Sequence, residues 1–150
     1  MGRTVSEDLL VHLRRAHDEI DRHYAEPLDL DRLAGLAGMS KYHFLRCFAA
    51  VYGHTPAAQL TRRRIERAQD LLRATNLTVT EVCMLVGYTS LGSFSSRFRR
   101  LVGTSPSAYQ ARWSAVGAPR IPGCFVFMHG LSDVAPGSAI AEKPPDRTGH

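Results

Sequence analysis

The sequence is poor in cysteine and has no long apolar run, and both absences narrow the classes of protein to which it can belong. The three cysteines, Cys47, Cys83 and Cys124, lie far apart in 150 residues, and no CxxC pair occurs. An odd number of dispersed cysteines argues against a disulfide framework and against a zinc ribbon. No window approaches the roughly 18 uninterrupted apolar residues of a membrane-spanning helix. The sequence therefore predicts neither a membrane protein nor a metal cofactor.

The N-terminus also lacks the apolar centre of a secretory signal, and MGRTVSEDLLVHLRRAHDE is charged instead. We therefore expect a cytoplasmic protein. Acidic residues are scarce in the middle of the chain: residues 32–113 hold twelve basic and three acidic side chains, net +9, whereas residues 1–31 carry net −4. A basic segment beside an acidic flank indicates a polyanionic partner, of which nucleic acid is the first choice.

What the sequence does contain is a repeat. Residues 40–56 read SKYHFLRCFAAVYGHTP, and residues 90–106 repeat the pattern as SLGSFSSRFRRLVGTSP. The shared landmarks are a Ser, two Phe, a Gly and a Pro, at Ser40/Ser90, Phe44/Phe94, Phe48/Phe98, Gly53/Gly103 and Pro56/Pro106. Ser favours a helix N-cap and Gly the residue just past a helix end, so each copy predicts one helix. In the first copy the phenylalanines face a core, with Tyr42, Leu45 and Arg46 opposite.

Each copy is preceded by a short predicted helix and a glycine turn, which is the helix-turn-helix pattern. Before the first copy, an amphipathic helix begins at Ser6 and reaches about Tyr24, and Asp29 caps a short helix over residues 30–37. Before the second copy, Thr80 is the predicted cap of the short helix, and residues 87–89 form the turn. We therefore predict an all-α fold of about seven helices in two helix-turn-helix subdomains.

Two Pro-initiated helices complete this prediction. Thr55-Pro56 begins a long helix to about Thr75, with an apolar stripe and, on its solvated remainder, Arg62, Arg63, Arg64, Arg67 and Arg73. Ser105-Pro106 begins a last helix to Trp113. The predicted organisation is a domain over residues 1–113, with a first subdomain at 6–53, a linker helix at 55–75 and a second subdomain at 79–113. Residues 114–150 form a partly disordered tail whose apolar stretch, residues 121–128, could dock as an extended segment.

The length of the linker helix suits two DNA grooves. About 20 helical residues span about 30 Å, and successive major grooves on one face of B-DNA lie about 34 Å apart. A single chain could then place both repeat helices in adjacent major grooves without dimerising. Because the copies repeat head to tail, we expect an asymmetric site.

The two repeat helices differ on their outer faces. Arg46 can bind guanine through two hydrogen bonds, and Tyr42 and Leu45 can contact a thymine methyl or a sugar. In the second helix, the outward positions are Gly92, Ser95, Ser96 and Arg99, with Ser93 and Arg97 at the edges. The predicted phosphate-contacting residues are Lys41, His43, Ser90, Arg99, Arg100, Arg62 and Arg63. We expect the first helix to supply most of the specificity and the second to supply mainly affinity.

The segments LAGLAGMSKYHFLRCFAAVYGHTP, RIERAQDLL and EVCMLVGYTSLGSFSSRFRRLVGTSPSAY together resemble the DNA-binding domain of the AraC/XylS family of transcriptional regulators. The resemblance covers about residues 6–113. It implies a homeodomain-like arrangement of seven helices and sequence-specific binding at promoters, usually to activate transcription. It also implies base contacts from positions of the first repeat helix that match Tyr42, Leu45 and Arg46. In the second repeat helix, the implied positions match Leu91, Gly92, Ser93, Ser96 and Arg97. At Leu91 and Gly92, this sequence lacks the long polar residues often found in the family.

The resemblance further implies double-stranded promoter DNA and RNA polymerase as partners, no cofactor, and association with the bacterial nucleoid through DNA. The chain has no room for the effector domain of most family members, so it resembles the stand-alone ones.

Two alternatives use the same core. A helical protein-interaction module could contact RNA polymerase or another regulator without reading DNA. An enzyme or metal site could use Cys47 with His43, four residues apart on one helix. The inward position of Cys47 and the lack of further ligands nearby argue against the second alternative.

Overall fold

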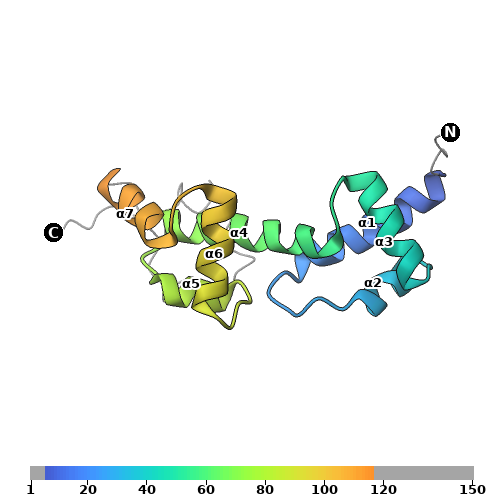
Figure 1. The fold of residues 1–150 in the computed structure, drawn as a ribbon, viewed down its shortest axis with the longest axis horizontal. Coiled ribbons are helices and arrows are strands. Elements are labelled where there is room, and N and C mark those ends of the chain that lie inside the picture. The colour runs from blue at the N-terminus through green and yellow to red at the C-terminus, as the bar shows by residue number, and fades with distance from the viewer. Residues whose placement is uncertain (1–5, 117–150) are drawn as a thin grey trace. The chain divides into compact units, whose positions relative to one another are not determined.

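The computed structural model describes residues 6–116, which form seven α-helices (Figure 1). In chain order these are α1 (Glu7–Arg22), α2 (Leu30–Leu36), α3 (Lys41–Tyr52), α4 (Pro56–Ala74), α5 (Val79–Leu85), α6 (Leu91–Val102) and α7 (Pro106–Val116). The all-α fold class is confirmed. The predicted tail segment, residues 121–128, lies outside the described residues.

The helices divide between two compact units, Met1–Arg64 and Ile65–His150. Unit 1 contains α1, α2, α3 and the start of α4, and unit 2 contains the rest of α4 with α5, α6 and α7. The long helix predicted as a linker is therefore shared: residues 56–64 belong to the first unit and residues 65–74 to the second. Its two ends take part in two different cores.

Helix ends follow the predicted capping residues at most positions. Ser6, Asp29, Ser40 and Ser90 are N-caps whose side-chain oxygens accept backbone N–H bonds from Leu9, Arg32, His43 and Ser93. α3 and α6 end at Gly53 and Gly103, which take the left-handed conformation with φ of 79° and 95°. Glycine has no Cβ to oppose that conformation, so both stops are determined by the residue type.

The start of α5 corrects one prediction. Thr78, not Thr80, is its N-cap: the Thr78 hydroxyl accepts the Glu81 N–H at 3.1 Å, and the Glu81 carboxylate accepts the Thr78 N–H at 2.8 Å. This reciprocal pair is a capping box. Thr80 lies inside the helix because Glu81 can complete the box only with the residue three positions before it.

Both helix-turn-helix turns use the same backbone device. At the end of α2, Met39 N donates to Ala34 O at 2.9 Å and Gly38 N donates to Gly35 O at 3.0 Å. At the end of α5, Tyr88 N donates to Cys83 O and Gly87 N donates to Met84 O. These are Schellman motifs, which need a positive φ at the glycine. Gly38 and Gly87 have φ of 68° and 102°, and each turn directs the chain into the helix that follows.

The cores of the two units are built alike. In α1, Leu13, Ala16 and Ile20 are buried, and in α4 the same i, i+3, i+7 spacing buries Ile65, Ala68 and Leu72. The phenylalanine pairs of α3 and α6 are all fully buried: Phe44, Phe48, Phe94 and Phe98. In unit 1, α3 packs against α1 and α2, and in unit 2, α6 packs against α5 and α7.

The arginines of α4 do not all lie on a solvated face, contrary to the sequence prediction. Arg67 is only 4% exposed, and its Nη1 lies 3.8 Å from Asp70 Oδ2. A buried guanidinium requires hydrogen-bonding or ionic partners, because an unpaired buried charge is costly. Arg67 is therefore part of the interior of unit 2.

We expect Thr78→Ala to lower the free energy of unfolding by about 1 kcal/mol, because the Glu81 N–H loses the hydroxyl that accepts its hydrogen bond. Thr80→Ala is the matched control: it removes the same atoms from an exposed helical position and should change stability by at most about 0.5 kcal/mol. Urea denaturation of both variants measures the difference. A loss in Thr80→Ala that equals or exceeds the loss in Thr78→Ala would contradict the capping assignment.

Candidate nucleic-acid interface

α3 is oriented by its buried face. Phe44 and Phe48 are fully buried with ring centroids 5.7 Å apart, and Phe48 also packs against Tyr52 at 4.7 Å. Successive helical residues turn by about 100°, so Arg46, midway between the two phenylalanines, points away from the core. Arg46 is exposed. The core of unit 1 thus determines which side of α3 faces outward.

The outer face of α3 carries the residues predicted to contact bases. Tyr42 is 81% exposed, Arg46 is exposed and Leu45 is half-buried. Tyr42 and Arg46 make no hydrogen bond or ion pair with any residue that the structure describes. A planar guanidinium and an amphipathic aromatic ring are therefore available to a partner on one helix face.

The predicted phosphate-contacting residues of α3 are exposed as well. Lys41 and His43 both lie in its first turn. Lys41 Nζ lies 3.3 Å from Asp31 Oδ1, but a surface pair of this kind is worth at most about 1 kcal/mol and can be exchanged for a stronger anion.

α6 repeats the same design with different outer residues. Phe94 and Phe98 are fully buried with centroids 5.8 Å apart, and they extend to Tyr88 and Tyr109, each 5.5 Å from a phenylalanine ring. Ser93 is half-buried, and the remaining predicted contact residues are exposed: Ser90, Ser96, Arg97, Arg99 and Arg100. Three arginines on a helix that bears no acidic residue make this surface strongly cationic.

The start of α6 is not polar, although the family resemblance implies base contacts there. Leu91, its first residue, is 45% exposed, and Gly92 follows it. The corresponding residues of α3 are Lys41 and Tyr42.

The second turn is held by a buried thiol. Cys83 Sγ lies 3.9 Å from Tyr88 O and 3.8 Å from Ser90 O, within reach of weak S–H hydrogen bonds. Burial raises the pKa of the Cys83 thiol, which therefore stays protonated and unreactive near neutral pH. Cys83 thus helps to fix the turn that positions α6.

Of the three arginines at the start of α4, one faces solvent and two donate hydrogen bonds to backbone carbonyls of residues 21–26. Arg62 is exposed. Arg63 Nε donates to Asp21 O at 3.3 Å, and its guanidinium lies 5.1 Å from the centroid of the Tyr24 ring. Arg64 donates to Tyr24 O at 2.6 Å and to Glu26 O at 2.9 Å. Of the two predicted phosphate-contacting residues here, Arg62 is the one that faces solvent without such contacts to the described residues.

Polar links fix the support helices at matching places in the two units. In unit 1, Gln59 Nε2 donates to Asp21 Oδ1 at 2.8 Å, and Gln59 Oε1 lies 2.6 Å from His54 Nε2. In unit 2, Arg73 donates to Tyr109 Oη at 3.3 Å and pairs with Asp70. The first link joins α1 to α4, the helix that follows α3. The second link joins α4 to α7, the helix that follows α6.

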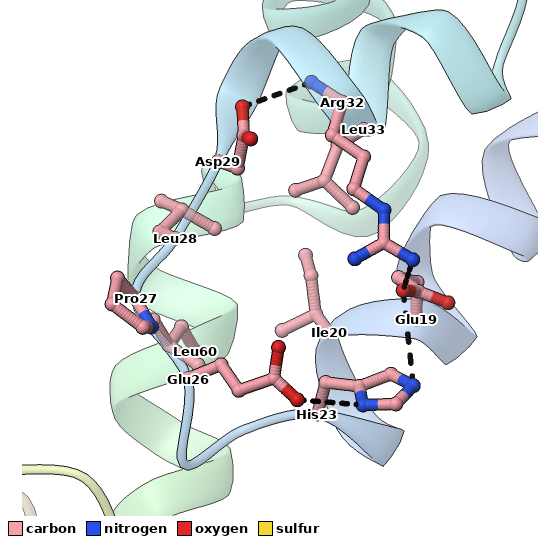
Figure 2. Close-up of a pocket in the computed structure, with 10 residues that line it drawn as sticks. All are labelled: Glu19, Ile20, His23, Glu26, Pro27, Leu28, Asp29, Arg32, Leu33 and Leu60. Atoms are coloured by element: carbon pink, nitrogen blue, oxygen red, sulfur yellow. Dashed lines mark hydrogen bonds and ion pairs between the residues drawn. The ribbon is translucent and has the colours of Figure 1, made fainter.

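A small hollow of unit 1 holds an ion-pair chain rather than an active site (Figure 2). Glu19 lies 2.7 Å from Arg32 and 3.8 Å from His23, whose Nδ1 lies 3.0 Å from Glu26. These side chains point toward one another between α1, α2 and the connecting loop. The chain connects the end of α1 to α2, which is a structural role.

The alternative metal pair, His43 and Cys47, gains no further ligand among the described residues. Cys47 is half-buried on α3. Over residues 6–116, no group of three or more His, Cys, Asp or Glu side chains is placed to hold a metal ion. In the same range, no helix combines the length and apolar character needed to cross a membrane.

Comparison with known proteins identifies the same residues as a DNA-binding domain. The sequence profile of a helix-turn-helix domain family matches residues 33–112. The chain is 36% identical over 96 residues to the MmsAB operon regulatory protein of Pseudomonas aeruginosa, covering 64% of this chain and 31% of that protein. It is 36% identical over 93 residues to the regulatory protein SoxS of Escherichia coli, covering 62% of this chain and 87% of SoxS.

Among solved structures, the fold is similar to the DNA-binding domain of the global transcriptional factor AdpA, crystallised in complex with a target DNA. The TM-score is 0.65 at 34% identity, over 69% of this chain and 94% of that one. The chain thus matches whole DNA-binding domains but spans less than a third of the Pseudomonas regulator.

We expect Arg64→Ala to lower the free energy of unfolding by about 1–2 kcal/mol, because the carbonyls of Tyr24 and Glu26 lose a charged donor. Arg62→Ala removes a similar side chain from an exposed position and should stay within about 0.5 kcal/mol of the parent protein. Urea denaturation compares the two. Equal losses would show that the contacts of Arg64 do not stabilise the fold.

Proposed function

Because the chain belongs to the AraC/XylS family of helix-turn-helix transcriptional regulators, we propose that it binds a specific double-stranded promoter site and activates transcription there. The observation that carries the proposal is the outer face of α3, where exposed Tyr42 and Arg46 lie opposite two fully buried phenylalanines. A helix face needed only for solubility would not require both a guanidinium and an exposed aromatic ring.

α3 is the proposed specificity helix. The Arg46 guanidinium can donate two hydrogen bonds to guanine O6 and N7, the commonest specific contact in the major groove. Tyr42 and Leu45 are the proposed neighbours of a thymine methyl or a sugar, and Lys41 and His43 of phosphates. Half or more of the hydrogen bonds in such interfaces go to the backbone and set the register of the helix.

α6 is the proposed affinity helix. Arg97, Arg99 and Arg100 are exposed on it, and Ser90 places a helix N-terminus where a phosphate can bind its N–H groups. Ser93, Ser96 and Arg97 are the proposed base contacts, where short hydroxyls discriminate weakly among bases. Contacts to phosphates give affinity that falls steeply with salt.

The two helices are proposed to read adjacent major grooves. α4 has 19 residues and is therefore about 28 Å long, comparable with the roughly 34 Å between successive major grooves on one face of DNA. The repeat runs head to tail in one chain, so one molecule suffices for an asymmetric site, and RNA polymerase is the proposed partner at the promoter. This role is non-enzymatic and needs no cofactor.

A helical module that binds protein rather than DNA is the alternative. Selection of bound duplexes from a random pool separates the two. The proposal expects enrichment of one asymmetric site with two blocks about one helical turn apart. No enrichment would favour the protein-binding module, and a palindromic site would contradict binding by one chain.

We expect Arg46→Ala to weaken binding to the selected site by about 1–3 kcal/mol and to relax the preference at one base pair. Fluorescence anisotropy with the selected duplex and its single-base variants measures both effects. If Arg46→Ala weakened binding to random duplexes equally, Arg46 would be a phosphate contact only.

Arg99→Ala should behave differently, because its contact is with the backbone. Binding should weaken by a similar factor on every duplex, and the slope of log affinity against log salt should decrease in magnitude by about 1. A loss confined to one sequence would assign Arg99 to a base instead.

A further inference from the structure

The fold does not require the residue types found at the first two positions of α6. α3 and α6 have the same length, the same serine cap, the same buried phenylalanine positions and the same glycine stop. At the first two positions, however, α3 has Lys41 and Tyr42 where α6 has Leu91 and Gly92. A long cation and an 81%-exposed ring are thus compatible with this scaffold in unit 1.

Gly92 has no role within its own unit that only glycine could fill. A Cβ built on Gly92 would meet only Ser90 Oγ, at 3.8 Å, which is ordinary van der Waals contact, and Gly92 is not in the left-handed conformation. Glycine in a helix also loses more conformational entropy on folding than alanine does. The missing side chain leaves room for a partner to approach the helix backbone closely.

Leu91 is equally unexplained by the core. It lies before the first buried phenylalanine of α6 and remains 45% exposed. On the same helix, Arg97, Arg99 and Arg100 are exposed, so a partner of this surface has to be anionic and yet offer an apolar group to Leu91. In the major groove of DNA, the one apolar group on the base edges is the C5-methyl of thymine.

We propose that Leu91 packs against the methyl group of one thymine, and that Gly92 allows the start of α6 to approach the groove closely enough for this contact. The second helix then reads a base by shape and apolar contact rather than by hydrogen bonds. This inference rests on the proposed DNA-binding function and assigns α6 a specificity of its own. It uses the N-terminal end of the helix, the part that reaches base edges in helix-turn-helix complexes.

The test removes the methyl group from the DNA. Each thymine of the selected site is replaced in turn by deoxyuridine, which keeps every hydrogen-bonding group and lacks only the methyl. The parent protein should bind about fourfold more weakly at one position, the effect of exposing about one methyl group. Leu91→Ala should bind the thymine and deoxyuridine duplexes equally at that position.

Leu101→Ala is the matched control, because Leu101 lies near the other end of α6 and is 46% exposed. It should keep the full fourfold thymine preference. If Leu91→Ala kept that preference as well, or if no thymine mattered to the parent protein, the inference would be wrong while DNA binding stood. If the parent protein enriched no duplex at all, the proposed function itself would fail.

Gly92→Ala tests the close approach. It should weaken binding to the selected site roughly tenfold, the effect of a methyl group forced into a packed contact, with a Tm that is unchanged or higher. Gly35→Ala is its control: Gly35 is an exposed helical glycine of α2, with nothing within 4 Å of a built Cβ. Gly35→Ala should bind DNA like the parent protein, and parent-like binding by Gly92→Ala would overturn the steric part.

Discussion

The structure depends on one constraint, the burial of two phenylalanines four residues apart on each repeat helix. Phe44, Phe48, Phe94 and Phe98 are all fully buried. Burying one such ring is worth about 1.5–3 kcal/mol, and each aromatic pair adds about 0.5–1.5 kcal/mol. Because a helix is rigid about its own axis, fixing these rings in a core fixes the direction of every other side chain on it. The outward direction of Arg46 and Ser96 is thus a consequence of packing on the opposite side.

The internal repeat separates what the scaffold requires from what it leaves free. The cap, the two rings, the stop and the following proline are the same residue types in both units. The outer positions share almost nothing, since Tyr42 corresponds to Gly92 and Arg46 to Ser96. Comparing the two copies therefore separates the positions that the scaffold requires from those that it leaves free. Where an exposed position carries different residue types in the two copies, the scaffold accepts both types.

Most of the fold could be predicted from the sequence because its signals are local. A serine cap, an i, i+4 pair of rings and a glycine stop all act within one helix, and they predicted α3 and α6 at the residues where the structure has them. The start of α5 was harder, since Thr78 and Thr80 both carry a capping hydroxyl. The reciprocal bond with Glu81 selects Thr78, and the spacing of that pair in the sequence was the available signal.

Contacts between distant segments set the limit of that prediction. Arg64 binds carbonyls of Tyr24 and Glu26, about 40 positions earlier in the chain, and no helical periodicity reports such a partner. The burial of Arg67 beside Asp70 could not be predicted either. The sequence of a helix does not show whether an arginine contacts water or a carboxylate. The assignment of Leu45, Arg46 and the other contact residues to bases or phosphates stays a prediction for the same reason: the partner is not in the chain.

These internal contacts change how the charge of the chain bears on a polyanionic partner. The net +9 of residues 32–113 counts every arginine alike. Several of these side chains, however, are held by carboxylates or carbonyls of their own unit, among them Arg32, Arg63, Arg64, Arg67 and Arg73. Within residues 32–113, the positive charge that faces solvent without such contacts to described residues comes from Arg46, Arg62, Arg97, Arg99, Arg100 and Arg112. Half of this set lies on α6, whose outer face otherwise carries only short or apolar side chains. In the proposed DNA complex, electrostatic attraction and base recognition would therefore be divided unequally between two helices that share one scaffold. Attraction would act mainly at α6, and hydrogen-bonded recognition mainly at α3.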